Sequence, residues 1–264
     1  MKKRIRLLAT AVVFAAMSLC VSCNKDDEEP SNTGGDTPAA PTNVINGHKY
    51  VDLGLPDGLL WATCNVGAAK PEDCGDYYAW GETEMKNDYS WSNYKFDKDN
   101  GLTKYCTDSS CGYDGFKDDI TVLQDVDDVA RVKWGSPWRM PTQSECQALI
   151  DNTYWQWTTN YHGVDGLNGY IVYRAKDETH KGKKNESSIT QLYSIDTDIH
   201  LFFPAAGAFD GTSVLQEGSA GMFWSSSLDL SETNWACQLG FFGNVLVSKP
   251  GSCRYIGFTV RPVR

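Results

Sequence analysis

The clearest helical pattern of apolar residues follows a polar segment near the middle of the chain. Cys146, Leu149 and Ile150 stand at positions i, i+3 and i+4, so a helix would carry all three side chains on one face. Such a stripe is typical of a helix that packs against a core. We therefore predict a short amphipathic helix here, with Cys146 as a buried free thiol.

The residues before this stripe predict where the helix begins. Thr142 is a favourable N-cap residue, and Glu145 three residues later has the spacing of a capping box. Pro141 stands just before the cap and bars an earlier start. The predicted helix therefore covers residues 142–150. Four tryptophans stand close by in the sequence, and we expect them to surround the helix as the packing centre of the domain: Trp134, Trp138, Trp155 and Trp157.

Weaker patterns predict a second helix and several short strands. Valines at 126, 129 and 132 share one helical face, which predicts a helix over about residues 126–133. Asn46-Gly47 between two apolar pairs is the signature of a type I′ hairpin turn. Residues 84–118 show no helical period and predict a long loop held by cysteines. Further strands are expected at Asp76–Trp80, Tyr170–Tyr173, His200–Phe203, Met222–Ser225, Trp235–Phe241, Val245–Val247 and Gly257–Val260. Together these elements favour an α+β domain.

Several motifs resemble those of known protein families. Arg139-Met140-Pro141-Thr142-x-x-Glu145 is similar to the Arg-Leu-Pro-Thr-x-x-Glu signature of formylglycine-generating-enzyme-like domains. The closer resemblance is to the Fibrobacter succinogenes major paralogous domain of gut-bacterial lipoproteins, and it covers roughly residues 45 to 264. It implies a C-type-lectin-like fold, which is an α+β domain with short twisted antiparallel sheets, two short helices and long loops. The segments that carry it are Val51–Pro56, Trp61–Gly67, Tyr78–Glu82, Asp127–Ala130, Phe203–Gly207, Phe223–Ser227 and Gly257–Val263.

The N-terminal segment has the pattern of a lipoprotein signal peptide. A basic start precedes an apolar run over Leu7–Val21 that is too short to span a bilayer comfortably. The run ends in Cys20-Val21-Ser22-Cys23, which resembles a lipobox with Cys23 as the lipidated residue. We expect residues 1–22 to be the signal peptide. Ordinary signal-peptidase cleavage nearby is the alternative.

Residues 23–43 predict an acidic flexible tether. Its run Asn24–Glu29 resembles the surface-export signal of lipoproteins in Bacteroides-like bacteria, and a solvated linker is the alternative. The lectin-like domain would then occupy residues 44–264. These segments predict an outer-membrane lipoprotein that is exposed at the cell surface and meets the membrane through its lipid anchor only.

The charge balance bears on the partners. The whole chain has a formal net charge of −10, and removal of residues 1–22 takes away four basic residues and no acids, which leaves −14. Binding to nucleic acid or anionic lipid needs clustered Lys and Arg, so neither is expected as a partner. The basic run Lys181–Lys184 lies in a polar stretch and predicts an exposed loop.

Cysteine usage fits an oxidising compartment. Once Cys23 takes lipid and Cys146 enters the core, six cysteines remain in the predicted domain. The local pairs are the simplest connectivity, and the sequence alone leaves the pairing open. We expect these disulfides: Cys64–Cys74, Cys106–Cys111 and Cys237–Cys253.

Catalytic and metal-binding patterns are weak. Asp97–Gly101 begins like an EF-hand loop but lacks the required Gly and Glu, so we expect no metal site. The acidic residues of Asp125–Asp128 are compatible with a calcium site. The alternative is that they cap a helix or are solvated, because the first turn of a helix favours acidic residues. No zinc pair, nucleophile elbow or P-loop occurs, so no catalytic residue or cofactor is assigned. Arg139 and Glu82 are expected to form an ion pair that fixes the fold.

The C-terminal third mixes aromatic and small polar residues, a combination that suits recognition surfaces. We predict ligand-binding residues at Asn234, Asn244, Arg254 and Tyr255. The predicted function is a non-enzymatic binding module for an extracellular glycan or protein. An enzyme of the formylglycine-generating type, another enzyme, or a structural surface protein are the alternatives.

Overall fold

The computed structural model describes residues 43–248 and 251–264. The predicted signal peptide, the tether and the lipidation site Cys23 lie outside the described residues. The described residues belong to one compact unit. Within the described ranges, no helix is long and apolar enough to cross a membrane.

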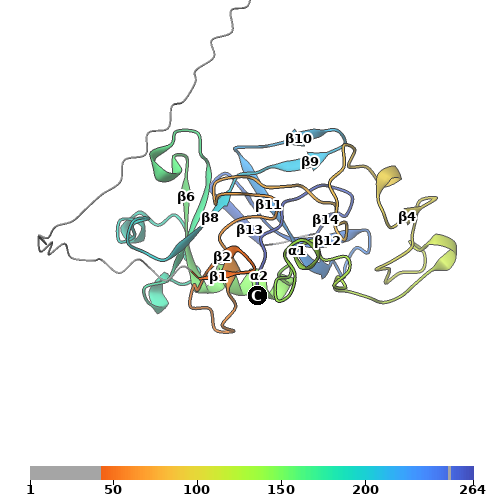
Figure 1. The fold of residues 1–264 in the computed structure, drawn as a ribbon, viewed down its shortest axis with the longest axis horizontal. Coiled ribbons are helices and arrows are strands. Elements are labelled where there is room, and N and C mark those ends of the chain that lie inside the picture. Colours follow the sequence, from red (N-terminus) through yellow and green to blue (C-terminus); the bar gives the residue numbers. More distant parts are fainter. Residues whose placement is uncertain (1–42, 249–250) are drawn as a thin grey trace, which may run out of the picture. The chain divides into compact units, whose positions relative to one another are not determined.

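The described part is a mixed α and β structure built mostly from small antiparallel sheets (Figure 1). One three-stranded sheet contains β1 (Val44–Ile45), β2 (His48–Val51) and β3 (Trp61–Ala62). A second three-stranded sheet contains β6 (Thr153–Thr158), β7 (Gly169–Arg174) and β8 (His200–Pro204). The four-stranded sheet contains β11 (Ala220–Leu228), β12 (Trp235–Phe242), β13 (Val245–Ser248) and β14 (Ser252–Cys253). Strands β4 (Asp97–Lys98) and β5 (Gly101–Leu102) form one two-stranded hairpin. Strands β9 (Ala208–Asp210) and β10 (Ser213–Leu215) form another. The α-helices are α1 (Val129–Trp134), α2 (Gln143–Asn152) and α3 (Ser187–Thr190).

Helix α2 confirms the strongest local prediction. The Thr142 hydroxyl accepts a hydrogen bond from the Glu145 N–H at 3.3 Å, and the Glu145 carboxylate accepts from the Thr142 N–H at 2.7 Å. Both halves of the capping box are therefore present. Cys146 and Leu149 are buried in one core cluster with Trp155, so the apolar stripe faces the core as expected.

The predicted partner of Arg139 is wrong. Its guanidinium makes two hydrogen bonds to the Glu145 carboxylate, at 2.8 and 2.6 Å, and so joins the strand-like segment before α2 to the capping box. Glu82 instead accepts from the Lys86 ammonium at 2.8 Å. The Arg-x-x-x-x-x-Glu contact is local, and it lets one carboxylate satisfy both the cap and the cation.

Helix α1 starts later than predicted. Asp128 is its N-cap and accepts from the Arg131 N–H at 3.0 Å, so Val126 lies before the helix. Val129 is buried, whereas Val126 is 69% exposed and Val132 is 47% exposed. The three valines therefore do not form one buried face, because the cap fixes the start of the helix at Val129.

Several predicted strands are present, and others are replaced by isolated bridges. The Asn46-Gly47 turn joins β1 to β2 with φ of 50° and 82°, the positive values that a type I′ turn requires. The predicted strands at 76–80 and 257–260 are not formed as strands. Tyr78 and Phe258 pair there by a single antiparallel bridge. Strand β6 directly follows α2 and was not predicted.

The segment near residue 261 fastens distant parts of the domain together. The Arg261 guanidinium is buried and donates to the Asn65 side-chain oxygen at 2.8 Å and to the Phe202 carbonyl at 2.9 Å. Val263 forms bridges to both Trp61 and Arg139. The C-terminal residues therefore hold the β1–β3 sheet next to the β6–β8 sheet and the segment before α2.

We expect Leu149→Ala to lower the free energy of unfolding by about 2–5 kcal/mol, because it leaves a cavity in a core where Leu149 is 0% exposed. Chemical denaturation of the purified protein measures the change. Val126→Ala removes apolar atoms from a side chain that is 69% exposed and should change stability by less than about 0.5 kcal/mol. Equal effects of the two substitutions would contradict the core position of α2.

Candidate ligand-binding cleft

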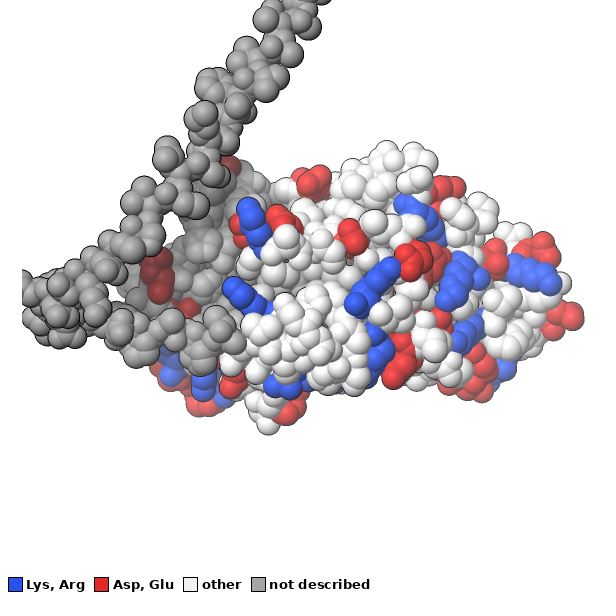
Figure 2. Space-filling model, in the orientation of Figure 1, with Lys and Arg blue, Asp and Glu red and all other residues white. Residues whose placement is uncertain are grey.

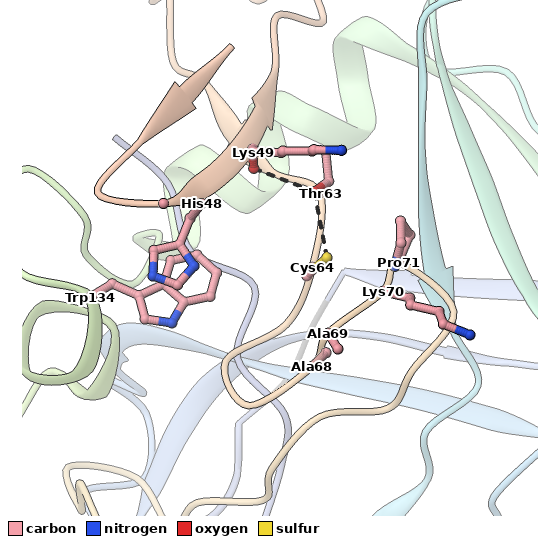
Figure 3. A pocket seen from close by; sticks show the side chains of 10 residues that line it. His48, Lys49, Thr63, Cys64, Ala68, Ala69, Lys70, Pro71 and Trp134 are labelled. Atoms are coloured by element: carbon pink, nitrogen blue, oxygen red, sulfur yellow. Dashed lines mark hydrogen bonds between the residues drawn. The ribbon is translucent and has the colours of Figure 1, made fainter. Parts of the chain in front are cut away.

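Two hollows on the described residues share one pair of stacked rings in their linings and form the two lobes of a cleft. The rings belong to His48 and Trp134, which line both lobes. The first lobe has a volume of about 530 Å³ and the second about 320 Å³. Figure 3 shows the first lobe, with the ring pair on one side and the loop 68–71 facing it across Thr63 and Cys64.

The β1–β2 hairpin and the end of α1 position this ring pair. The Asn46 side-chain amide donates to the carbonyls of Trp134 at 2.9 Å and Ser136 at 3.0 Å. In return, the Trp138 indole N–H donates to the Ile45 carbonyl at 3.1 Å. These hydrogen bonds join the β1–β2 turn to the residues at and just after the end of α1. The turn that sets the hairpin register therefore also fixes the position of the ring pair.

The ring geometry is closely packed. The His48 imidazole lies 3.6 Å from the Trp134 ring centroid, with the planes only 7° apart. Trp138 meets both rings edge-on, at 6.3 Å from His48 and 5.3 Å from Trp134. Burial lowers the pKa of His48 below its usual value, so the stacked imidazole is neutral at pH 7.

The first lobe carries cations and small polar groups. Lys49 and Lys70 are both exposed and stand at its rim. The Thr63 hydroxyl lies 3.4 Å from the Lys49 carbonyl and 3.5 Å from the Cys64 sulfur (Figure 3). The loop that carries Lys70 is held by Asp73, whose carboxylate accepts from the Lys70 N–H at 3.0 Å.

The second lobe has a different character because carboxylates line it. Asp76 accepts from the Tyr78 hydroxyl at 3.1 Å, and Glu84 pairs with Lys133 at 2.8 Å. Gly67 lies against Asp76 with φ of 81°, and a Cβ atom there would come within 2.3 Å of the Asp76 carboxylate. The positive φ favours glycine at this wall, and any side chain there would also displace the Asp76 carboxylate.

The cleft offers rings, hydroxyls, ammonium groups and carboxylates to a ligand. Thr63, Asp76 and Glu84 make local bonds within the protein, whereas Lys49 and Lys70 are exposed at the rim. The stacked pair fixes the orientation of the shared wall. In the part of the chain that the structure describes, no group of three or more His, Cys, Asp and Glu side chains is arranged to hold a metal ion.

The acidic residues at 125–128 bind cations and N–H groups of the protein itself. Asp127 is 3% exposed, and its carboxylate accepts from Lys95 at 2.7 Å, Lys104 at 2.6 Å and the Tyr105 hydroxyl at 2.7 Å. Asp128 caps α1. The structure therefore matches the helix-terminus interpretation of these acids, and it adds an ion-pair cluster that ties the loop around Lys95 and Lys104 to the start of α1.

The four ligand-binding residues predicted in the C-terminal third do not share a surface. The prediction of Arg254 as a ligand-binding residue is wrong, because its side chain is 0% exposed and donates to the carbonyls of Tyr105 and Thr233. Asn234 and Tyr255 are half-buried near the start of β12 and just after β14. Asn244 is exposed in the turn at the other end of β12.

The three predicted disulfides are not formed in the structure. All seven cysteines of residues 43–248 and 251–264 are free. The β12–β14 register places Cys253 opposite Trp235 and not opposite Cys237. The other four thiols have different neighbours: Cys64 meets the Thr63 hydroxyl, Cys74 the Glu217 carboxylate, Cys106 the Asp108 carbonyl, and Cys111 the Asn234 amide.

The sequence prediction did not identify the cleft residues. His48 and Trp134 meet although the Asn46 contact that joins their segments spans 88 positions. The local signals were present, because Asn46-Gly47 predicted the hairpin and Trp134 was placed near the helices. Nothing in a local pattern indicates which of several tryptophans a hairpin residue will stack on.

Comparison with known proteins gives no assignment. No family model matches the chain, no curated protein matches it, and no solved structure matches it.

The His48 pKa predicts a pH dependence of stability. Because the folded state lowers this pKa, the unfolded chain binds a proton more readily once the pH falls below the unfolded value of about 6.5. The contribution of neutral His48 is fully present above that value and is lost as the pH falls towards the folded pKa. Thermal unfolding at about pH 7.5 and about pH 5.5 should therefore show a smaller pH-dependent loss for His48→Gln than for the wild type.

The same slope in the wild type and His48→Gln would mean that the imidazole is not held neutral by its packing.

Proposed function

We propose that this domain is a non-enzymatic binding module that holds an extracellular glycan in the cleft between the β1–β2 hairpin and α1. The observation that carries the proposal is the ring pair of His48 and Trp134, which forms a common wall of both lobes. Ligand sites in proteins are typically concave, with aromatic walls and a few polar groups that fix orientation. This cleft has that composition.

The chemistry of a sugar ring fits these walls. Its C–H faces are apolar and pack against indole and imidazole edges, while its hydroxyls need hydrogen-bonding partners. Thr63 and Asp76 provide such partners on the two sides of the ring pair. Because Asn46 and Trp138 lock the hairpin to α1, little ordering entropy remains to be lost when a ligand enters.

The wider proposal concerns how the site is presented. The motif resemblance supports a C-type-lectin-like version of the observed mixed fold, and the N-terminal pattern supports a lipid anchor at Cys23 followed by a flexible tether. Such an arrangement displays a compact recognition domain away from the outer membrane. A protein ligand, catalysis of the formylglycine-generating type and a purely structural role are the competing outcomes of the tests below.

Cys23→Ala should release the protein from the membrane fraction and abolish palmitate labelling, because the thiol is the proposed acylation site. Fractionation and metabolic labelling of cells that express the two forms measure this. Ser18→Ala is the matched control, since that residue lies within the proposed signal peptide but before the Cys20–Cys23 motif, and it should leave labelling unchanged. A Cys23→Ala protein that remains labelled and membrane-bound would refute the lipobox assignment.

Trp134→Ala should weaken glycan binding roughly thirtyfold, the effect of losing a central aromatic contact of about 2 kcal/mol. A glycan array identifies binders of the purified wild-type protein, and calorimetric titration with the best binder measures the loss. Trp134→Phe keeps an aromatic wall and should retain most of the affinity, which separates a binding role from a folding defect.

Trp235→Ala is the control, because Trp235 is 36% exposed on β12 and does not line the cleft. It should leave affinity unchanged. If Trp235→Ala or Tyr255→Ala weakened binding and Trp134→Ala did not, the ligand face would lie in the C-terminal third. Turnover of a cysteine peptide or glycoside would support the enzyme instead.

A further inference from the structure

We infer that the ligand of this cleft is an acidic saccharide, with an anionic group of its ring bound between Lys49 and Lys70 in the first lobe. The inference rests on the proposed function and adds the charge of the ligand and its direction in the cleft. The evidence for this inference is that lysines line the first lobe and carboxylates line the second.

The first lobe has positive charge without a carboxylate in its lining. Its ionisable side chains are those of His48, Lys49, Cys64 and Lys70. Among the described residues, Lys49 has no ion-pair partner. Lys70 approaches Glu72 only at 4.0 Å, and the side chain of Lys70 is 68% exposed. Both ammonium groups are therefore available to an incoming anion.

This local charge differs from that of the rest of the molecule. The chain has a formal net charge of −10, and Figure 2 shows acidic and basic side chains intermixed over the visible face. Most lysines of the described part lie beside a carboxylate, as Lys86 does with Glu82 and Lys133 with Glu84. Lys98 and Lys184 also lack a carboxylate partner among the described residues, so Lys49 is distinguished by lying with Lys70 in the lining of one hollow.

The second lobe sets the direction of the ligand. Asp76 and Glu84 line it, and only Lys133 opposes them, already paired with Glu84 at 2.8 Å. An anionic group there would meet like charge, whereas neutral hydroxyls can donate hydrogen bonds to the Asp76 carboxylate. The acidic ring of the saccharide therefore enters the first lobe and a neutral portion of the ligand passes the ring pair into the second.

The size of the first lobe is compatible with this ligand. Its volume of about 530 Å³ lies within the range of roughly 300–1,000 Å³ that is typical of small-molecule sites. Figure 3 shows Lys49 and Lys70 on different segments, with both ammonium groups turned away from the ring pair towards the outer edge of the lobe. A sugar ring that lies over Cys64 would present its anionic group at this rim.

The test compares a tetrasaccharide that has one terminal galacturonic acid and three neutral galactose rings with its methyl ester, which has the same ring skeleton without the charge. Calorimetric titration of the full mature protein should give about tenfold higher affinity for the acid at about 0.15 M salt, and less difference at about 1 M salt. The double variant Lys49→Gln/Lys70→Gln should lose the preference for the acid and keep its affinity for the ester.

Lys183→Gln/Lys184→Gln is the matched control, because it removes the same charge from exposed lysines outside the cleft. It should keep the tenfold preference. Equal affinity of the wild type for acid and ester, with both weakened by Trp134→Ala, would overturn the acidic-ligand inference and leave the proposed glycan function standing. Failure of both oligosaccharides and of every array glycan to bind would overturn the two together.

Discussion

The rest of the fold depends on a buried cation that has no carboxylate partner among the described residues. The Arg261 guanidinium is 1% exposed and donates to the Asn65 side chain and to the carbonyls of Ala62 and Phe202. Burial lowers its pKa to about 10, so it stays charged at neutral pH. Removing a cation from water is costly, and only well-placed acceptors offset that cost. Three segments must therefore be correctly placed at once for the core to close.

Arg254 repeats the same device in the other half of the domain. It lies over the Trp80 ring with 5.2 Å between the guanidinium carbon and the ring centroid, and it donates to carbonyls of Tyr105 and Thr233. Lysine cannot replace either residue without loss, because its single ammonium does not present donors in a planar fork. Two guanidinium groups thus join segments that lie far apart in the chain, whereas the predicted disulfides would have linked cysteines that are near one another in the sequence. The Ala62 carbonyl accepts a hydrogen bond from Arg261, and Ala62 directly precedes the cleft residues Thr63 and Cys64. The same hydrogen bonds therefore help to position the lining of the cleft.

Local chemistry was predictable from the sequence, and long-range contacts were not. The Thr142 cap and the Asn46-Gly47 turn depend on neighbours within a few residues, so their patterns sufficed. Arg139 was given the wrong partner because charge alone does not rank distant acids against a near one. Arg254 was predicted at a recognition surface because aromatic and small polar residues are mixed around it in the sequence. Its acceptors are backbone carbonyls, which no sequence pattern reveals. The stacking of His48 on Trp134 is a contact of the same long-range kind.

The ring pair has a consequence that follows from its being one wall with two sides. Because the same two rings line both lobes, a ligand portion that moved the Trp134 indole in one lobe would also change the wall of the other. Whatever occupies one lobe therefore sets the room left in its neighbour. Two ligand portions that each press on the rings compete for the same space, and two that fit the resting position favour each other. By linkage, the effect of the first portion on the binding free energy of the second equals the effect of the second on the first. The affinity of the cleft therefore depends on the combined shape of the two portions.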